Sequence, residues 1–187
     1  NCRFATFRNI STPGNLAFEP VEIWPGLTYS GFTSRVIDLD GDGRAELLGQ
    51  HGSSSVFIDF WIAQNISTPG NIEFGSSIDF TFGNSIDAGA GVGAGDLDND
   101  GKPELLVSDA FGARFHIMKN NSTPGTISFS QLGIINTGQY NNSMQVADLN
   151  LDGKNDLIWK MTGGSIRIRL NTNTGGPLSV DDFPAEI

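Results

Sequence analysis

The sequence predicts an all-β protein made of β-propeller blades, each with four antiparallel strands, and about three and a half such blades in the chain. Three observations predict this fold. No window of ten or more residues has a clean 3.6-residue apolar period, a unit of about 55 residues recurs, and an acidic loop recurs with that unit. Each full unit is expected to read strand, acidic loop, strand, short turn, strand, STPG turn, strand.

The acidic loop is clearest in DLDGDGRAELL, which begins at Asp38 and has carboxylates at positions 1, 3, 5 and 9 and glycine at position 6. Carboxylates so close together repel one another, whereas a Ca²⁺ ion takes roughly 6–8 oxygen ligands at about 2.3–2.6 Å. The spacing therefore predicts a calcium site. Its ligands would be the carboxylates of Asp38, Asp40, Asp42 and Glu46 and the backbone carbonyl of Arg44, whose side chain would point to solvent.

An acidic surface turn would explain one such loop equally well, but the pattern occurs three times. It begins again at Asp96 (DLDNDGKPELL) and at Asp148 (DLNLDGKNDLI). The third loop has Asn150 at position 3 and thus one charge fewer, so we expect it to bind calcium most weakly. The ligands predicted for the second and third ions are Asp96, Asp98, Asp100, Lys102 and Glu104, and Asp148, Asn150, Asp152, Lys154 and Asp156.

The residues around the loops exclude an EF-hand. An EF-hand needs a bidentate glutamate at position 12 and a helix on each side. Position 12 is Gly49, Val107 or Trp159 here, and none of these side chains can bind calcium. The flanking segments are too short and too rich in glycine for helices, which favours strands. Each loop is therefore expected to join two antiparallel strands.

A second motif repeats with the loops. RNISTPGNLAF begins at Arg8, QNISTPGNIEF at Gln64 and KNNSTPGTISF at Lys119, and a divergent copy, LNTNTGGPLSV, begins at Leu170. Residues 1–187 are accordingly interpreted as a single repeat domain. Its expected parts are a half blade at 1–24, blades at 31–85 and 89–136, and a blade with a weak last strand at 143–180. Such an arc would be part of a larger propeller, or other copies would complete it.

The DxDxDGxxE/D loop, the segment GVGAGDLDNDGKPELLVSDAFG and the asparagine before the STPG turn resemble those of FG-GAP/VCBS repeat proteins, whose blades are similar to those of integrin α-subunits. The resemblance covers nearly the whole chain. It implies calcium in all three loops, bound by the residues named above.

Composition limits the class of partner. The formal net charge is −10, and three Ca²⁺ ions would add six positive charges and leave −4. This balance argues against nucleic-acid binding, which needs a basic surface. A single cysteine, Cys2, excludes an internal disulfide. No apolar run approaches the ~20 residues of a membrane span. Loops that bind calcium at millimolar concentration suit an extracellular or cell-surface location.

No catalytic constellation is evident, so an enzyme is not expected. The two histidines, His51 and His116, fall at different places in their repeats. We expect a secreted or cell-surface calcium-binding module that serves adhesion or binds a protein or glycan ligand. The alternatives are a structural spacer or surface-layer repeat, or an accessory domain of a secreted polysaccharide-degrading enzyme. Trp24, Trp61, Tyr29, Tyr140 and Phe111 are candidates for stacking on sugars, although core packing would explain them as well.

Overall fold

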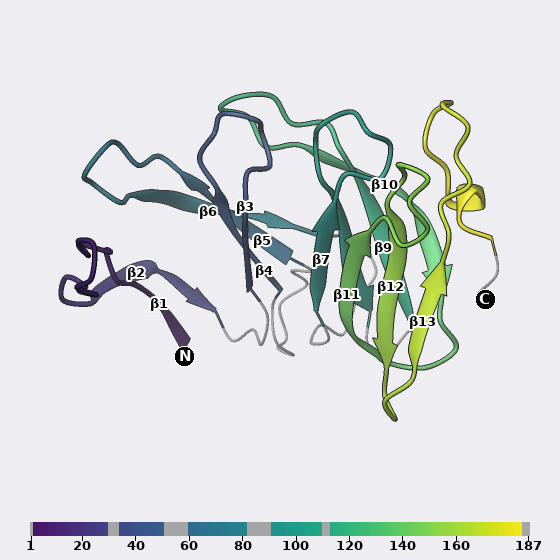
Figure 1. Cartoon of the computed structure of the whole chain (residues 1–187), viewed down its shortest axis with the longest axis horizontal. Coiled ribbons are helices and arrows are strands. Elements are labelled where there is room, and N and C mark those ends of the chain that lie inside the picture. The colour runs from purple at the N-terminus through teal and green to yellow at the C-terminus, as the bar shows by residue number, and fades with distance from the viewer. Residues whose placement is uncertain (1, 30–33, 51–59, 82–90, 110–112, 185–187) are drawn as a thin grey trace.

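The structure is a computed structural model that describes residues 2–29, 34–50, 60–81, 91–109 and 113–184 (Figure 1). Within these ranges the protein is all-β, every strand pairs antiparallel, and the only helical element is a single 3₁₀ turn, η1 (Val180–Asp182). The predicted all-β class with antiparallel sheets is thus confirmed, whereas the propeller and its blade count stay predictions. The strands are β1 (Cys2–Thr6), β2 (Glu22–Tyr29), β3 (Ser34–Ile37), β4 (Glu46–Gln50), β5 (Phe60–Asn65), β6 (Phe74–Phe80), β7 (Val92–Gly95), β8 (Glu104–Asp109), β9 (Arg114–Asn120), β10 (Phe129–Asn136), β11 (Asn141–Ala147), β12 (Asp156–Met161) and β13 (Ile166–Arg169).

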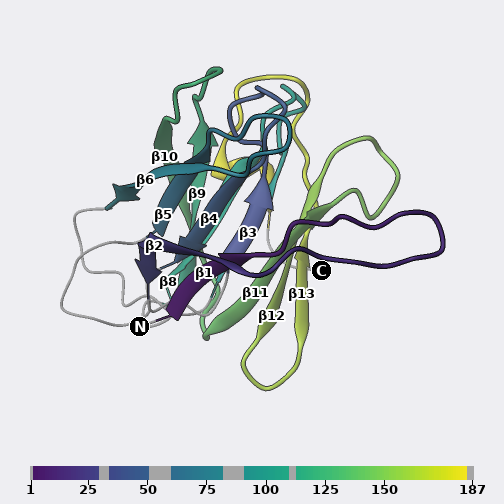
Figure 2. The ribbon, with the colours of Figure 1, turned by 90° about the vertical axis from the view of Figure 1, so that its left-hand side faces the viewer.

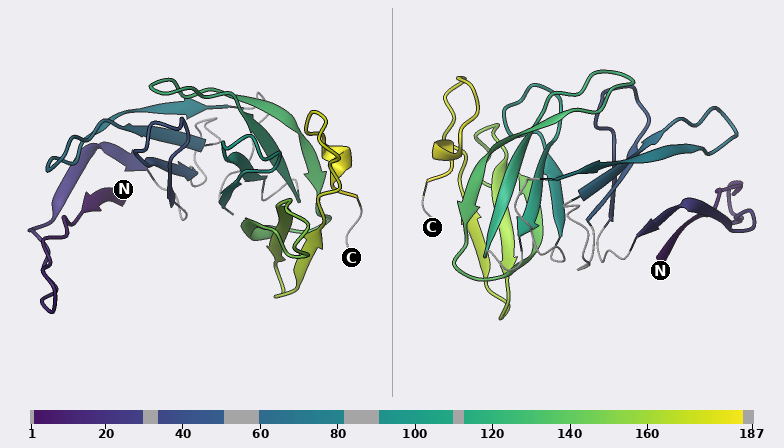
Figure 3. Two further views of the ribbon diagram at one scale, coloured as in Figure 1. Left: turned by 45° about the horizontal axis from the view of Figure 1, so that its top comes forward. Right: turned by 180° about the vertical axis from the view of Figure 1, so that it is seen from behind.

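The strands form four sheets, and each sheet uses strands that are consecutive in the chain. The orders are β1-β2, β3-β4-β5-β6, β7-β8-β9-β10 and β11-β12-β13. The sheets follow one another along an arc, with the N-terminal sheet at one end and the C-terminal sheet at the other (Figure 3). Figure 2 shows the arc from its N-terminal side, with the connection between β1 and β2 projecting from it.

Three apolar clusters lie between successive sheets and hold the arc together. On β8, Leu105 packs toward the preceding sheet and the next residue, Leu106, toward the following one. Successive side chains of a strand point to opposite faces, so the sheet β7–β10 buries both of its faces. In the sheet β3–β6, Leu47 and Leu48 of β4 divide in the same way. Because both faces of these sheets are buried, their strands contain near-continuous runs of apolar residues.

Glycines on β7 allow the next sheet to approach closely. A Cβ placed on Gly95 would lie 2.5 Å from Cβ of Val146 on β11, and one on Gly93 would lie 2.9 Å from the backbone oxygen of Met144. The first strand of one sheet therefore packs directly against the first strand of the next. The small residues that the sequence places before the second acidic loop meet this requirement.

The chain after β13 differs from the expected weak fourth strand. Residues 170–184 contain no strand and turn back instead. Leu178 and Phe183 are buried in the last apolar cluster, and Val180 packs against Gly133 of β10. A capping box at Ser179 closes this turn. The burial of these apolar side chains against the preceding sheet accounts for the turn that replaces the strand.

The first strand remains open on one side. Among the described residues β1 pairs with β2 alone. From the sequence we expect the other edge of β1 to pair with the C-terminus of this chain, a second copy, or the rest of a longer chain, because exposed edges promote association. This pairing stays a prediction.

Candidate metal centre

The three acidic loops occupy equivalent places in three successive sheets. They join β3 to β4, β7 to β8 and β11 to β12, and they lie on the upper side of the molecule in Figure 1. Each loop connects two antiparallel strands, as expected, and no helix flanks any of them.

The same hydrogen bonds shape each loop. The sixth-position glycine has φ between +83° and +86°, which favours glycine, and its N–H donates to Oδ2 of the first aspartate over 2.9 Å. The seventh-position N–H donates to Oδ1 of the fifth-position aspartate over 2.8–3.0 Å. The glycines are Gly43, Gly101 and Gly153, and the seventh-position residues are Arg44, Lys102 and Lys154.

The ninth-position carboxylates are fully buried in all three loops. Glu46, Glu104 and Asp156 are each 0% exposed. Each accepts a hydrogen bond from the N–H of the second-position leucine, over distances of 2.7–2.9 Å. One such bond does not compensate a buried carboxylate for its lost hydration. Glu104 also accepts hydrogen bonds from Lys119 Nζ and the N–H of Asn120, and Asp156 accepts one from the N–H of Asn171. Oε1 of Glu46 has no such partner.

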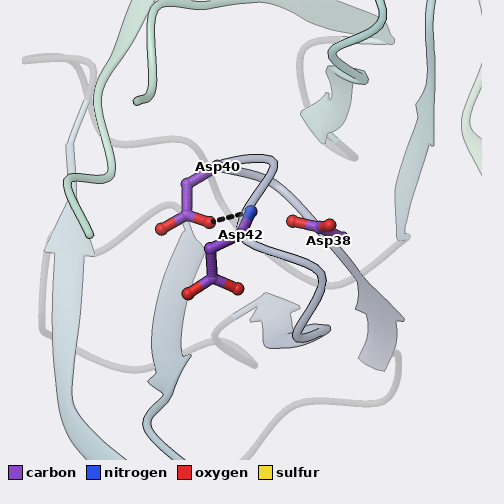
Figure 4. A group of neighbouring side chains, drawn as sticks. All are labelled: Asp38, Asp40 and Asp42. Atoms are coloured by element: carbon purple, nitrogen blue, oxygen red, sulfur yellow. Dashed lines mark hydrogen bonds between the residues drawn. The ribbon is translucent and has the colours of Figure 1, made fainter. Parts of the chain in front are cut away.

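The first loop collects carboxylates around one point. Ligand oxygens of Asp38, Asp40 and Asp42 all lie within 4.8 Å of one another, and Figure 4 shows the three side chains projecting from this single loop. Asp40 is only 1% exposed. Its Oδ2 accepts a hydrogen bond of 2.8 Å from the backbone N–H of Gly125, which belongs to the STPG turn of the next sheet. The neighbouring sheet thus fixes one side of the cluster.

Glu46 makes the first loop suited to a cation. Its Oε1 has no hydrogen-bond partner, although the side chain is fully buried. The N–H of Asn65 also faces this carboxylate and acts to lower its pKa, but it does not reach Oε1 with normal hydrogen-bond geometry. Burial, aided by the charges of Asp40 and Asp38, raises the pKa of Glu46 to about 6. A divalent cation among these oxygens would supply the missing partner, so the residues present fit Ca²⁺.

The side chain of Arg44 is exposed, as expected, and it also has a partner in the loop. Its guanidinium pairs with the carboxylate of Asp42. Desolvation acts to raise the pKa of Asp42, but the backbone N–H and the guanidinium of Arg44 outweigh it, so the pKa is lowered. Arg44 therefore keeps Asp42 ionised.

The second loop also gathers carboxylates but contains a lysine. Ligand oxygens of Asp96, Asp98 and Glu104 lie within 4.8 Å of one another. Lys119 of β9 reaches into the loop and forms ion pairs with three of its carboxylates. Burial alone would lower the pKa of Lys119, but its hydrogen bonds to Asp100 and Asp98 and the charge of Glu104 raise it above the usual range. This lysine was not singled out from the sequence.

The third loop is the most open. Its three carboxylates, unlike those of the first two loops, do not fall within 4.8 Å of one another. Lys154 Nζ lies 3.5 Å from Asp152 Oδ2 at the surface. Asn150 accepts a hydrogen bond of 3.1 Å from the N–H of Asp152. The predicted ligands share the loop, but they are less converged than in the first loop.

Buried asparagines connect the loops to one another. Asn120 Nδ2 donates to the carbonyl oxygens of Pro103, in its own sheet's loop, and of Leu39, in the preceding loop. Asn171 likewise bridges Asn155 and Leu97. The Oδ1 atom of each accepts the N–H two residues later. The sequence analysis did not predict that these asparagines bridge neighbouring loops. The signal for it was an asparagine at the same place in every repeat.

The aromatic and histidine candidates do not gather in one open site. Trp61 is buried between the first two sheets, and Trp24 packs edge-on against Phe74 in the same cluster. Tyr140 is exposed. His116 is buried, and burial lowers its pKa. Neither His51 nor Phe111 lies within the described residues, and the side chain of Tyr29 is not described either.

No protein-family model matches the chain, and no curated protein matches it significantly. None of the described helical segments is long and apolar enough to cross a membrane.

Proposed function

We propose that this chain is a calcium-binding repeat module of the FG-GAP/VCBS type, with blades of propeller type. Bound calcium would neutralise the acidic loops and fix their positions relative to the sheets. The observation that carries the proposal is the fully buried Glu46, whose Oε1 has no hydrogen-bond partner, beside the converging carboxylates of Asp38, Asp40 and Asp42.

The arrangement of the sheets supports the propeller part of the proposal. Sheets of two to four consecutive strands follow one another along an arc, and the first strand of the third sheet, β7, packs against the first strand of the next, β11. This is the packing expected of blades around an axis. In this account the arc is completed by further blades of a longer chain or by a second copy.

The biological role in this account is adhesion or ligand binding outside the cell, with a protein or glycan as the ligand. Trp61 is buried and is not available to stack on a sugar, and Trp24 is half-buried against the same cluster. Their burial favours a protein ligand, or the alternative of a structural spacer, over a glycan platform made by these two residues.

Calcium-dependent stability tests the proposal. The unfolded chain cannot hold the loop geometry, so calcium at about 100 times its Kd should stabilise each occupied site by about 2.7 kcal/mol. We expect the melting temperature to rise in millimolar CaCl₂ and to fall in chelator. Asp40→Asn should reduce this difference, whereas Asp181→Asn, at an exposed acidic residue outside the loops, should preserve it. Equal melting temperatures of the unmodified protein in calcium and in chelator would refute the proposal.

A further inference from the structure

The ammonium group of Lys119 lies among the carboxylates of the second acidic loop. Its Nζ is 2.5 Å from Asp98 Oδ2, 2.8 Å from Asp100 Oδ2 and 3.1 Å from Glu104 Oε1. The lysine side chain is only 23% exposed. These three carboxylates are the ones predicted to bind calcium at positions 3, 5 and 9.

The other two loops lack a cation at this place. Lys119 directly precedes the repeated asparagine, Asn120. The residue at the same position is Gln64 in the first full unit and Leu170 in the last. The amide Nε2 of Gln64 also faces its acidic loop, 3.3 Å from Asp40 Oδ2, but it is neutral. The side chains of Gln64 and Lys119 therefore both reach the acidic loop of their own sheet, and of the two only Lys119 brings a positive charge.

A lysine ammonium and a calcium ion cannot use the same oxygens at the same time. Calcium would need these oxygens at about 2.3–2.6 Å, and two cations that share three ligands would repel each other strongly. For calcium to take these three oxygens, the lysine must leave and give up three charge-assisted hydrogen bonds. The cost of breaking them weakens metal binding.

We propose that Lys119 is a built-in cation that closes the second loop without metal, so that this loop binds calcium more weakly than the first loop does. The inference rests on the proposed calcium binding of the first loop. It also gives the second loop a reason to bind calcium weakly that is independent of the one expected for the third loop from Asn150.

The sixth-position glycines allow each loop to be observed separately. The N–H groups of Gly43, Gly101 and Gly153 donate to the first aspartate of their own loops. Their amide resonances in a ¹H–¹⁵N spectrum should therefore report occupation of each loop during titration with CaCl₂. In the unmodified protein we expect Gly101 to respond at a calcium concentration at least about tenfold above that for Gly43.

Exchanging the residues at the equivalent position tests the cause. Lys119→Gln should lower the calcium concentration at which the Gly101 resonance shifts by at least about tenfold. Gln64→Lys should raise the calcium concentration at which the Gly43 resonance shifts by a similar factor. Lys160→Gln removes an exposed lysine outside the loops, so it should leave the calcium concentrations at which the three glycine resonances shift unchanged. The Gln64→Lys variant keeps the inference testable if Lys119→Gln does not fold.

The outcomes separate the two proposals. If Gly43 responds to calcium but Gly101 responds at the same concentration in the unmodified protein and in the Lys119→Gln variant, the role assigned to Lys119 is wrong. The same conclusion follows if Gln64→Lys leaves the response of Gly43 unchanged. If no glycine responds in any variant, calcium binding itself fails and the proposed function falls with it.

Discussion

Asn120 Nδ2 donates a 2.8 Å hydrogen bond to the carbonyl oxygen of Leu39, which lies 81 residues earlier in the chain. The bond joins the end of β9 to the first acidic loop, and the same amide holds Pro103 of the second loop. Asn171 repeats this bridge one sheet later, with Leu97 as its acceptor. The acidic loops are therefore parts of one connected edge.

Asn120→Ala should destabilise the protein by about 2–4 kcal/mol, because it leaves buried carbonyl oxygens and the Ser122 N–H without their partner. Urea denaturation measures the change. Asn9→Ala is the matched control, since Asn9 opens the same turn in an exposed position and should cost much less. Equal losses in the two variants would show that the bridge contributes nothing.

Glu46→Gln should have opposite effects with and without calcium. In the metal-free protein the pKa of Glu46 is raised to about 6 from 4.5, so the folded state holds this proton more tightly than the unfolded chain. The stability of the metal-free protein therefore falls as the pH rises through this window, and the full penalty is present at pH 7. Removing the charge should stabilise the metal-free protein by about 1–2 kcal/mol at pH 7.

In saturating calcium the same variant should be less stable than the unmodified protein, because it has lost a ligand. Thermal melts in chelator and in CaCl₂ at pH 7 compare the two conditions. Glu73→Gln is the control, since Glu73 is exposed outside the acidic loops and its replacement should not stabilise the metal-free protein. A destabilised Glu46→Gln variant in chelator would contradict the account of the buried charge.

Gly95→Ala should destabilise the protein by about 1–3 kcal/mol, because the new Cβ would lie 2.5 Å from Val146 on the next sheet. Val146→Ala in the same chain should recover part of the loss, as measured by urea denaturation. Gly176→Ala, with open space around the added Cβ, serves as the control. Failure of Val146→Ala to relieve the loss would argue against direct packing of β7 on β11.

Leu151→Gly should stabilise the third loop. Leu151 is 90% exposed and has φ of +63°, a left-handed conformation that costs a non-glycine residue about 1–2 kcal/mol. The equivalent residues are Gly41 and Asn99, which adopt such angles more readily. We expect a gain of at most about 1 kcal/mol in urea denaturation, since glycine also loses more entropy on folding. A clear loss of stability would show that the leucine side chain has a role of its own.

The local parts of this structure could be predicted from the sequence, because they depend on residues close together in the chain. The acidic loops and their flanking strands belong to this class. The bridge from Asn120 to Leu39 and the insertion of Lys119 among Asp98 and Asp100 depend on how sheets and strands align in space. Spacing along the chain does not fix that alignment, and the burial of Phe183 against the preceding sheet escaped prediction for the same reason.

The most direct test of the central claim is a crystal structure of the protein grown in millimolar CaCl₂, with anomalous scattering used to locate calcium. The account predicts an ion in the first loop, bound by Asp38, Asp40 and Asp42 and by the carbonyl oxygen of Arg44 at about 2.3–2.6 Å, with Glu46 completing its environment. A well-ordered first loop without an ion, in which Glu46 Oε1 accepts a hydrogen bond from the protein instead, would contradict it.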